Sequence, residues 1–201
     1  AWVKQNEPAI YDKIAHVMLP GDFVSMKFTG HITTSISSLS EGIFWDFKNN
    51  ELSKDILNFY GFDQSVLPNI QPVFSHHGEL LPEIAAKLNL KPGIPITYKA
   101  GDQPNNALSL NVLEPGEVAA TAGTSGVIYG VTDKITYDPQ SRVNTFAHVN
   151  HTDQLNRLGV LLCINGTGIL NSWVKKMVGA GNDYPQMNQA ASQIQPGSDG
   201  L

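Results

Sequence analysis

The tripeptide Gly101-Asp102-Gln103 joins a short apolar segment to a stretch with helical spacing. Residues 94–99 are predicted to form a strand and residues 105–113 a helix, with Pro104 at the first helical position, where its missing N–H costs nothing. An acid after a strand lies at the edge of an α/β sheet where ligands bind, and there a carboxylate accepts a proton from a hydroxyl. Asp102 is therefore a candidate general base. The alternative reading, that it only caps the helix, stays open.

The segment 121–126, Thr-Ala-Gly-Thr-Ser-Gly, lies between predicted strands at 118–122 and 127–131. Small residues let the backbone approach a ligand, and successive N–H groups in a tight turn bind anions. The hydroxyls of Thr124 and Ser125 add donors, so a phosphate is the natural ligand. The segment lacks the Gly-Lys-Ser/Thr ending of a Walker A loop. An ordinary glycine-containing hairpin is the alternative.

A second glycine-containing turn, Asn165-Gly166-Thr167-Gly168, joins a predicted strand at 158–164 to a predicted helix at 169–178. A helix N-terminus favours phosphate or the polar part of a nucleotide. A plain strand-to-helix turn is the alternative. The dinucleotide pattern G-x-G-x-x-G is incomplete because its third glycine is Asn171, and Asp183, near the offset of the required acid, lies in a loop-like stretch. An NAD-dependent enzyme is therefore disfavoured.

Other chemistry-bearing residues form no recognisable site. No cysteine or acid completes a metal-binding spacing around His76-His77 or around His148 and His151, so we expect solvated loop histidines and no metal site in this chain. Cys163 lies in an apolar run and is expected to be a core thiol. As the only cysteine it excludes an intramolecular disulfide.

Capping residues predict further helices. Ser53 is expected to cap residues 54–60, which end at Gly61, and a helix is predicted over 81–88 with Pro82 near its start. Asp22 is expected to cap residues 23–29. We further predict a surface excursion over 132–157, a helix near 186–194 and a domain boundary at 114–117.

Composition restricts the class of protein. The 201 residues carry 13 basic and 18 acidic side chains, a net charge of −5, which excludes a basic nucleic-acid binder. A 41% apolar content indicates a globular chain. The longest apolar run, 159–164, is far shorter than the ~20 residues of a membrane span, and no signal peptide is visible, so a cytoplasmic protein is expected.

Together these segments resemble the FGGY family of carbohydrate kinases, in order and spacing across essentially the whole chain. Besides Gly101-Asp102-Gln103 and Gly123-Thr124-Ser125-Gly126, the resemblance rests on the stretches Trp2–Asn6, Leu19–Phe23, Phe28–Gly30 and Pro196–Leu201. Within the family the pattern is most similar to the xylulokinases.

The resemblance implies an actin-like, ribonuclease-H-like α/β fold of two domains around a cleft. Residues 1–113 would be the later part of the first, sugar-binding domain, and residues 117–201 the beginning of the second, ATP-binding domain. Both domains would be incomplete, because the chain lacks an initial Met, begins inside a signature and ends before later family motifs. We therefore expect an internal fragment that is inactive alone and that depends on flanking sequence, or on a second chain, for folding.

The resemblance also implies roles for single residues. Asp102 would accept the proton of a sugar hydroxyl as ATP phosphorylates it, and Gln103 would bind a neighbouring hydroxyl. Gly123, Thr124 and Ser125 would hold the terminal phosphates, and Gly168 would lie against the nucleotide. Mg²⁺ would bridge the phosphates, with its protein contacts outside this chain.

The implied substrate is D-xylulose, with glycerol, gluconate, ribulose or fuculose as alternatives, and the intact protein is expected to be a homodimer. A non-catalytic, actin-like nucleotide-binding module is the competing class of function. Such a module would not need an acid at position 102.

Overall fold

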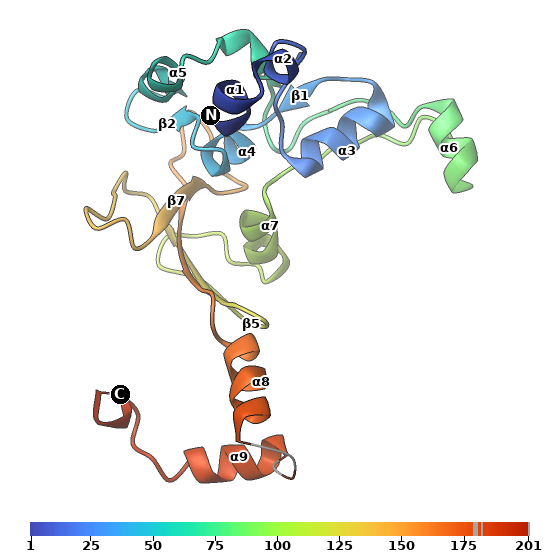
Figure 1. The fold of residues 1–201 in the computed structure, drawn as a ribbon. Coiled ribbons are helices and arrows are strands. Elements are labelled where there is room, and N and C mark those ends of the chain that lie inside the picture. Colours follow the sequence, from blue (N-terminus) through green and yellow to red (C-terminus); the bar gives the residue numbers. More distant parts are fainter. Residues whose placement is uncertain (179–180, 182, 201) are drawn as a thin grey trace. The chain divides into compact units, whose positions relative to one another are not determined.

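The computed structural model describes residues 1–178, 181 and 183–200, apart from the side chain of Asp199. The chain divides into two compact units (Figure 1). The first consists of residues 1–119 and 129–161, and the second of residues 120–128 and 162–201. The predicted Asp102 segment lies in the first unit, and the predicted phosphate segments lie in the second.

The first unit contains seven described helices and several very short strands. The helices are α1 (Trp2–Asn6), α2 (Pro8–Tyr11), α3 (Pro20–Thr29), α4 (Ile36–Glu41), α5 (Lys54–Tyr60), α6 (Pro82–Leu88) and α7 (Asp102–Ser109), with a 3₁₀ turn at Gln64–Val66. The short strands pair as β1 (Thr33–Thr34) with β4 (Asn69–Ile70), in parallel, and β2 (Trp45–Asp46) with β3 (Glu51–Leu52), antiparallel.

Local capping explains where two of these helices begin and end, as the sequence predicts. The Ser53 side chain accepts a hydrogen bond from the Ile56 amide at the start of α5, and Gly61 ends the helix in the left-handed conformation. Pro82 occupies the first turn of α6, where its missing N–H has no helical partner to lose.

The predicted strand at 94–99 is wrong as a continuous strand. This segment runs antiparallel to residues 73–80 through isolated bridges that join Phe74 to Tyr98 and Glu79 to Pro95. Pro95 has no N–H to donate, and Gly78, at φ 124°, breaks the opposite chain, so a regular ladder does not form. The pairing still leads the chain directly to Gly101 and α7.

Four longer strands form one sheet in the order β5-β6-β8-β7. They are β5 (Val118–Ala122), β6 (Gly126–Thr132), β7 (Asn144–Ala147) and β8 (Leu158–Ile164). Three of them confirm predicted strands, whereas β7 lies in the predicted surface excursion. Within the first unit β7 pairs antiparallel with β8, with Ala147 opposite Leu158, and both side chains are buried. The apolar content of this segment is too low for sequence alone to predict a core strand.

The second unit contains helices α8 (Gly168–Met177) and α9 (Tyr184–Ala191) and a 3₁₀ turn at Ser198–Gly200. The predicted helix at 169–178 is confirmed, with each end shifted by one residue: α8 begins at Gly168 and ends at Met177, and Val178 is its C-cap. The helix expected near 186–194 begins earlier, at Tyr184, because Asp183 and Gln186 form a capping box.

Candidate functional site

Asp102 is the first residue of α7 and does not cap it. Gly101 is the N-cap residue, and no side chain caps this helix. The Asp102 carboxylate is exposed, and Gln103 Nε2 donates a long, 3.5 Å hydrogen bond to its Oδ2. The N-terminus of a helix favours negative charge. The local alternative for Asp102, a helix cap, is therefore not what the structure has.

A buried ion pair fixes the segment that leads into Asp102. Lys99 Nζ lies 3.1 Å from Asp22 Oδ1 and donates to the carbonyl and hydroxyl oxygens of Thr33 at 2.7 and 2.9 Å. The Thr34 hydroxyl donates to Asp22 Oδ2 at 2.7 Å. The predicted helix-capping role of Asp22 is wrong, because α3 already begins at Pro20 and the carboxylate points into the interior. The pair thus joins α3 and β1 to the strand-like segment before α7.

Helix α4 contacts the same segment with one of its faces. The Gly101 amide donates to Ser37 Oγ at 3.4 Å, and the Glu41 carboxyl group lies against Gly101 so closely that a methyl group there would overlap it. Burial, and then the negative charges of Asp102 and Asp22, raise the pKa of Glu41 to about 7. Sequence reasoning misses Glu41, because nothing in its serine-rich surroundings indicates a partner so far along the chain.

In the second unit the structure brings the two predicted phosphate segments together. The amides of Gly168 and Ile169 donate to the carbonyl oxygens of Gly123 and Thr124, at 3.0 and 3.1 Å, and Thr167 Oγ1 donates to the Gly123 oxygen at 3.1 Å. The first N–H groups of α8 are therefore used to hold the loop.

The backbone amides of Thr124 and Ser125 donate no backbone hydrogen bond in the part of the chain that the structure describes. Two adjacent N–H groups on an exposed turn are suitable donors for a phosphate. A methyl group at Gly168 would overlap the Gly123 carbonyl, so a larger residue would displace the loop.

The expectation of solvated histidines is correct only for His76. His77 and His148 are buried, and burial lowers the pKa of both. His148 Nε2 lies 3.0 Å from the Val112 carbonyl oxygen, so Nε2 carries the proton and donates it. His148 Nδ1 then accepts a hydrogen bond from the Tyr129 hydroxyl, whose oxygen is 3.0 Å away. Cys163 is exposed rather than buried, because the described residues bury only the first half of β8.

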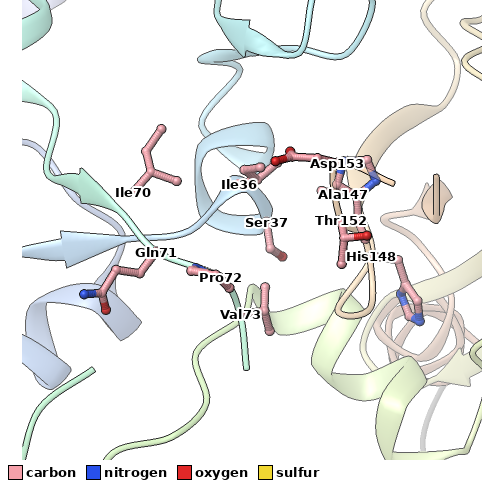
Figure 2. Close-up of a pocket in the computed structure, with 11 residues that line it drawn as sticks. Ile36, Ser37, Ile70, Gln71, Pro72, Val73, Ala147, His148, Thr152 and Asp153 are labelled. Carbon is pink, nitrogen blue, oxygen red and sulfur yellow. The ribbon is translucent and has the colours of Figure 1, made fainter. Parts of the chain in front are cut away.

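A cavity of about 240 Å³ lies between α4, the chain after β4 and the turn after β7, and Figure 2 shows Ser37 and His148 on its walls. Its lining is Ile36, Ser37, Ile70, Gln71, Pro72, Val73, Ala147, His148, His151, Thr152 and Asp153. None of the predicted site residues lines it. Ser37 links the cavity to the Asp102 segment through its bond with the Gly101 amide.

The comparison with known proteins identifies the family. The model of the FGGY family of carbohydrate kinases, N-terminal domain, matches residues 1–109. The chain belongs to this family. A xylulose kinase from Bacillus subtilis (strain 168) is 29% identical over 200 residues, which are 100% of this chain and 39% of that protein.

Solved structures agree with the family. The crystal structure of a xylulose kinase from Rhodospirillum rubrum matches this FGGY chain with a TM-score of 0.85 and 26% identity. The match covers 100% of this chain and 40% of the Rhodospirillum rubrum chain. A gluconate kinase from Lactobacillus acidophilus matches with a TM-score of 0.88 and 17% identity, which concerns the fold alone. The predicted actin-like α/β fold is thereby confirmed. Among the described residues no helix is long and apolar enough to span a bilayer.

Proposed function

We propose that this chain is part of a longer kinase, called the full-length kinase below, that transfers the γ-phosphoryl group of ATP to a hydroxyl of D-xylulose. Family membership supports the carbohydrate kinase, and the chain spans only 39% of the relative from Bacillus subtilis. Residues 1–113 would belong to the sugar-binding domain and residues 117–201 to the ATP-binding domain. The similarity to the xylulose kinases from Bacillus subtilis and Rhodospirillum rubrum supports xylulose over glycerol, gluconate, ribulose or fuculose.

Asp102 would act as the general base. Its exposed position at the first residue of α7 is the observation that carries this role, because the carboxylate is free to meet a substrate hydroxyl. As the sugar oxygen bonds to phosphorus and the bond to the ADP oxygen breaks, the hydroxyl proton passes to Asp102. Gln103, bonded to Asp102, would bind a neighbouring hydroxyl of the sugar as both donor and acceptor.

The loop of Gly123, Thr124 and Ser125 would hold the terminal phosphates of ATP, with Gly168 against the nucleotide. The N–H groups of Thr124 and Ser125, which donate no backbone hydrogen bond in the described part of the chain, are suitable donors for an anion. No cluster of three or more His, Cys, Asp or Glu side chains in residues 1–178, 181 and 183–200 is arranged to hold a metal ion, and the protein contacts of a phosphate-bound Mg²⁺ would come from sequence outside this chain. A homodimer and a cytoplasmic location stay predictions.

Replacement of the base tests the proposal. In the full-length kinase, Asp102→Asn should fold and bind sugar but lose about 10²–10⁴-fold in kcat, because the amide cannot accept the proton. Asp55→Asn is the matched control, since Asp55 is also an exposed acid in the first turn of a helix, α5. Coupled ADP release, measured over a panel of ketoses and polyols, gives both kcat and the sugar preference. Near-normal turnover of Asp102→Asn would rule out its role as base.

A further inference from the structure

The Glu41 carboxyl group occupies the space in which a side chain at position 101 would lie. Gly101 has φ −65° and ψ 166°, a conformation that any residue adopts. Backbone freedom therefore does not explain a glycine at this position. The three atoms nearest to a methyl group built there all belong to the Glu41 carboxyl group, and the overlap is severe. Glycine is needed because Glu41 is there.

Ser37 and Glu41 act on Gly101 from the same face of α4, since residues four apart in a helix are neighbours. Ser37 Oγ accepts the Gly101 N–H, and Glu41 packs on the Gly101 α-carbon. Gly101 is the N-cap of α7, and the next residue is Asp102. One helical turn of α4 thus fixes the position of the Gly101 backbone, which directly precedes Asp102.

Three titratable side chains interact electrostatically with the Glu41 carboxyl group. Asp22 of α3, which is paired with Lys99, and Asp102 of α7 both oppose a negative charge on it, and so does burial. Tyr129 of β6 is coupled to it, because burial and then Glu41 raise the pKa of the Tyr129 hydroxyl. Glu41 Oε1 has no hydrogen-bond partner within the described part of the chain. A neutral carboxyl group suits this place better than a carboxylate.

We propose that Glu41 is a positioning residue for Asp102: its carboxyl group packs on Gly101 and fixes the start of α7, and its charge state sets the electrostatic surroundings of the base. The inference rests on the proposed function, in which Asp102 is that base. A neutral Glu41 leaves Asp102 as the negative charge at the start of α7. Once Glu41 loses its proton, a second negative charge lies beside the reacting hydroxyl and opposes the incoming phosphoryl group.

A double-mutant cycle tests the packing. In the full-length kinase, Gly101→Ala should lower kcat by at least ~10-fold, because the displaced Asp102 loses its alignment, with little change in the KM for ATP. In a Glu41→Ala background the same substitution should cost no more than ~2-fold, since the overlap is gone. Equal losses in both backgrounds would overturn the packing argument. Circular dichroism identifies variants that fail to fold.

The pH profile tests the charge. Wild-type kcat should fall with a midpoint near pH 7 as Glu41 ionises, whereas Glu41→Gln, which keeps the shape and cannot ionise, should lack this fall. Glu51→Gln, an exposed glutamate paired with Lys54, is the control and should keep the wild-type profile. Identical profiles for wild type and Glu41→Gln would refute the charge role, and a Gln variant that does not fold would refute the neutral carboxyl group.

A readout besides activity separates the two proposals. Carboxyl ¹³C NMR of the full-length kinase should show Glu41 titrating near pH 7, and lower in Asp102→Asn, because one opposing charge has been removed. If the titration midpoint of Glu41 is the same in wild type and in Asp102→Asn, the inference is wrong, and the proposed function is unaffected. If Asp102→Asn keeps its activity while the titration midpoint of Glu41 falls as expected, the proposed function is wrong. The electrostatic interaction between Glu41 and Asp102 would then still stand.

Discussion

The two glycines of the turn before α8 differ in what surrounds them. A methyl group at Gly168 would overlap the carbonyl group of Gly123, whereas at Gly166 the nearest atom would be Leu170 Cβ at an ordinary 3.8 Å. We expect Gly168→Ala to displace the phosphate loop and to weaken ATP binding by the full-length kinase at least ~10-fold, through overpacking of about 1–3 kcal/mol. Gly166→Ala is the matched control and should bind ATP within ~2-fold of wild type. Isothermal titration with ATP measures both.

Sequence alone predicts those functional residues that a short stretch of neighbouring residues marks. Asp102, Thr124 and Gly168 each lie in a short turn between apolar segments, so residue type and position suffice to select them as candidates. Glu41 and Lys99 give no such signal, because each acts on a partner far along the chain, Gly101 and Asp22 respectively. A contact of this kind follows from the fold and not from spacing.

Elements of the first unit are joined by the Asp22–Lys99 pair, whose removal we expect to be costly. Lys99→Met leaves the Asp22 carboxylate buried without its counter-charge and should lower the free energy of unfolding by about 3–5 kcal/mol. The double variant Asp22→Asn/Lys99→Met should lose less, because no unpaired charge remains and the amide still accepts from the Thr34 hydroxyl. Urea unfolding of the full-length kinase measures both losses.

The exposed pair of Lys54 and Glu51 provides the control for that experiment. Lys54→Met removes a salt bridge of 2.8 Å that water surrounds, and its expected cost is only about 0.5 kcal/mol. If the double variant at positions 22 and 99 is less stable than Lys99→Met alone, the buried charge is not the origin of the loss. Packing of the two side chains would then be the dominant contribution.

Whole elements follow from the sequence where capping or apolar runs mark them. Helix α5 has Ser53 before it and Gly61 after it, and β8 is a continuous apolar run, so both are predicted with their observed bounds. Strand β7 carries too few apolar residues to stand out, yet pairing with β8 buries Ala147. The segment 94–99 has strand composition, but Pro95 and the opposing Gly78 prevent a regular ladder. Tertiary pairing decides both cases.

At the scale of the whole molecule the two units differ in burial. Among the described residues of the second unit, Val127 alone is buried, and helix α8 exposes Leu170, Trp173 and Met177 by 48%, 56% and 67%. The other buried residues among those that the structure describes belong to the first unit, including Leu158 and Tyr129. Because burial of apolar surface is the main stabilising contribution to folding, the second unit gains little stability from its own packing.

Hydrogen exchange should therefore separate the units when the 201-residue chain is studied alone. We expect the amides of α8 and of the last residues of β8 to exchange rapidly, those that pair β7 with β8 in the first unit to stay protected, and the chain to transfer no phosphoryl group. In the full-length kinase the same α8 amides should become protected, because apolar side chains exposed here, such as Trp173, would be covered. Mass spectrometry of both proteins under one labelling protocol makes the comparison. Equal protection of α8 in the two proteins would mean that the second unit is stable without further sequence.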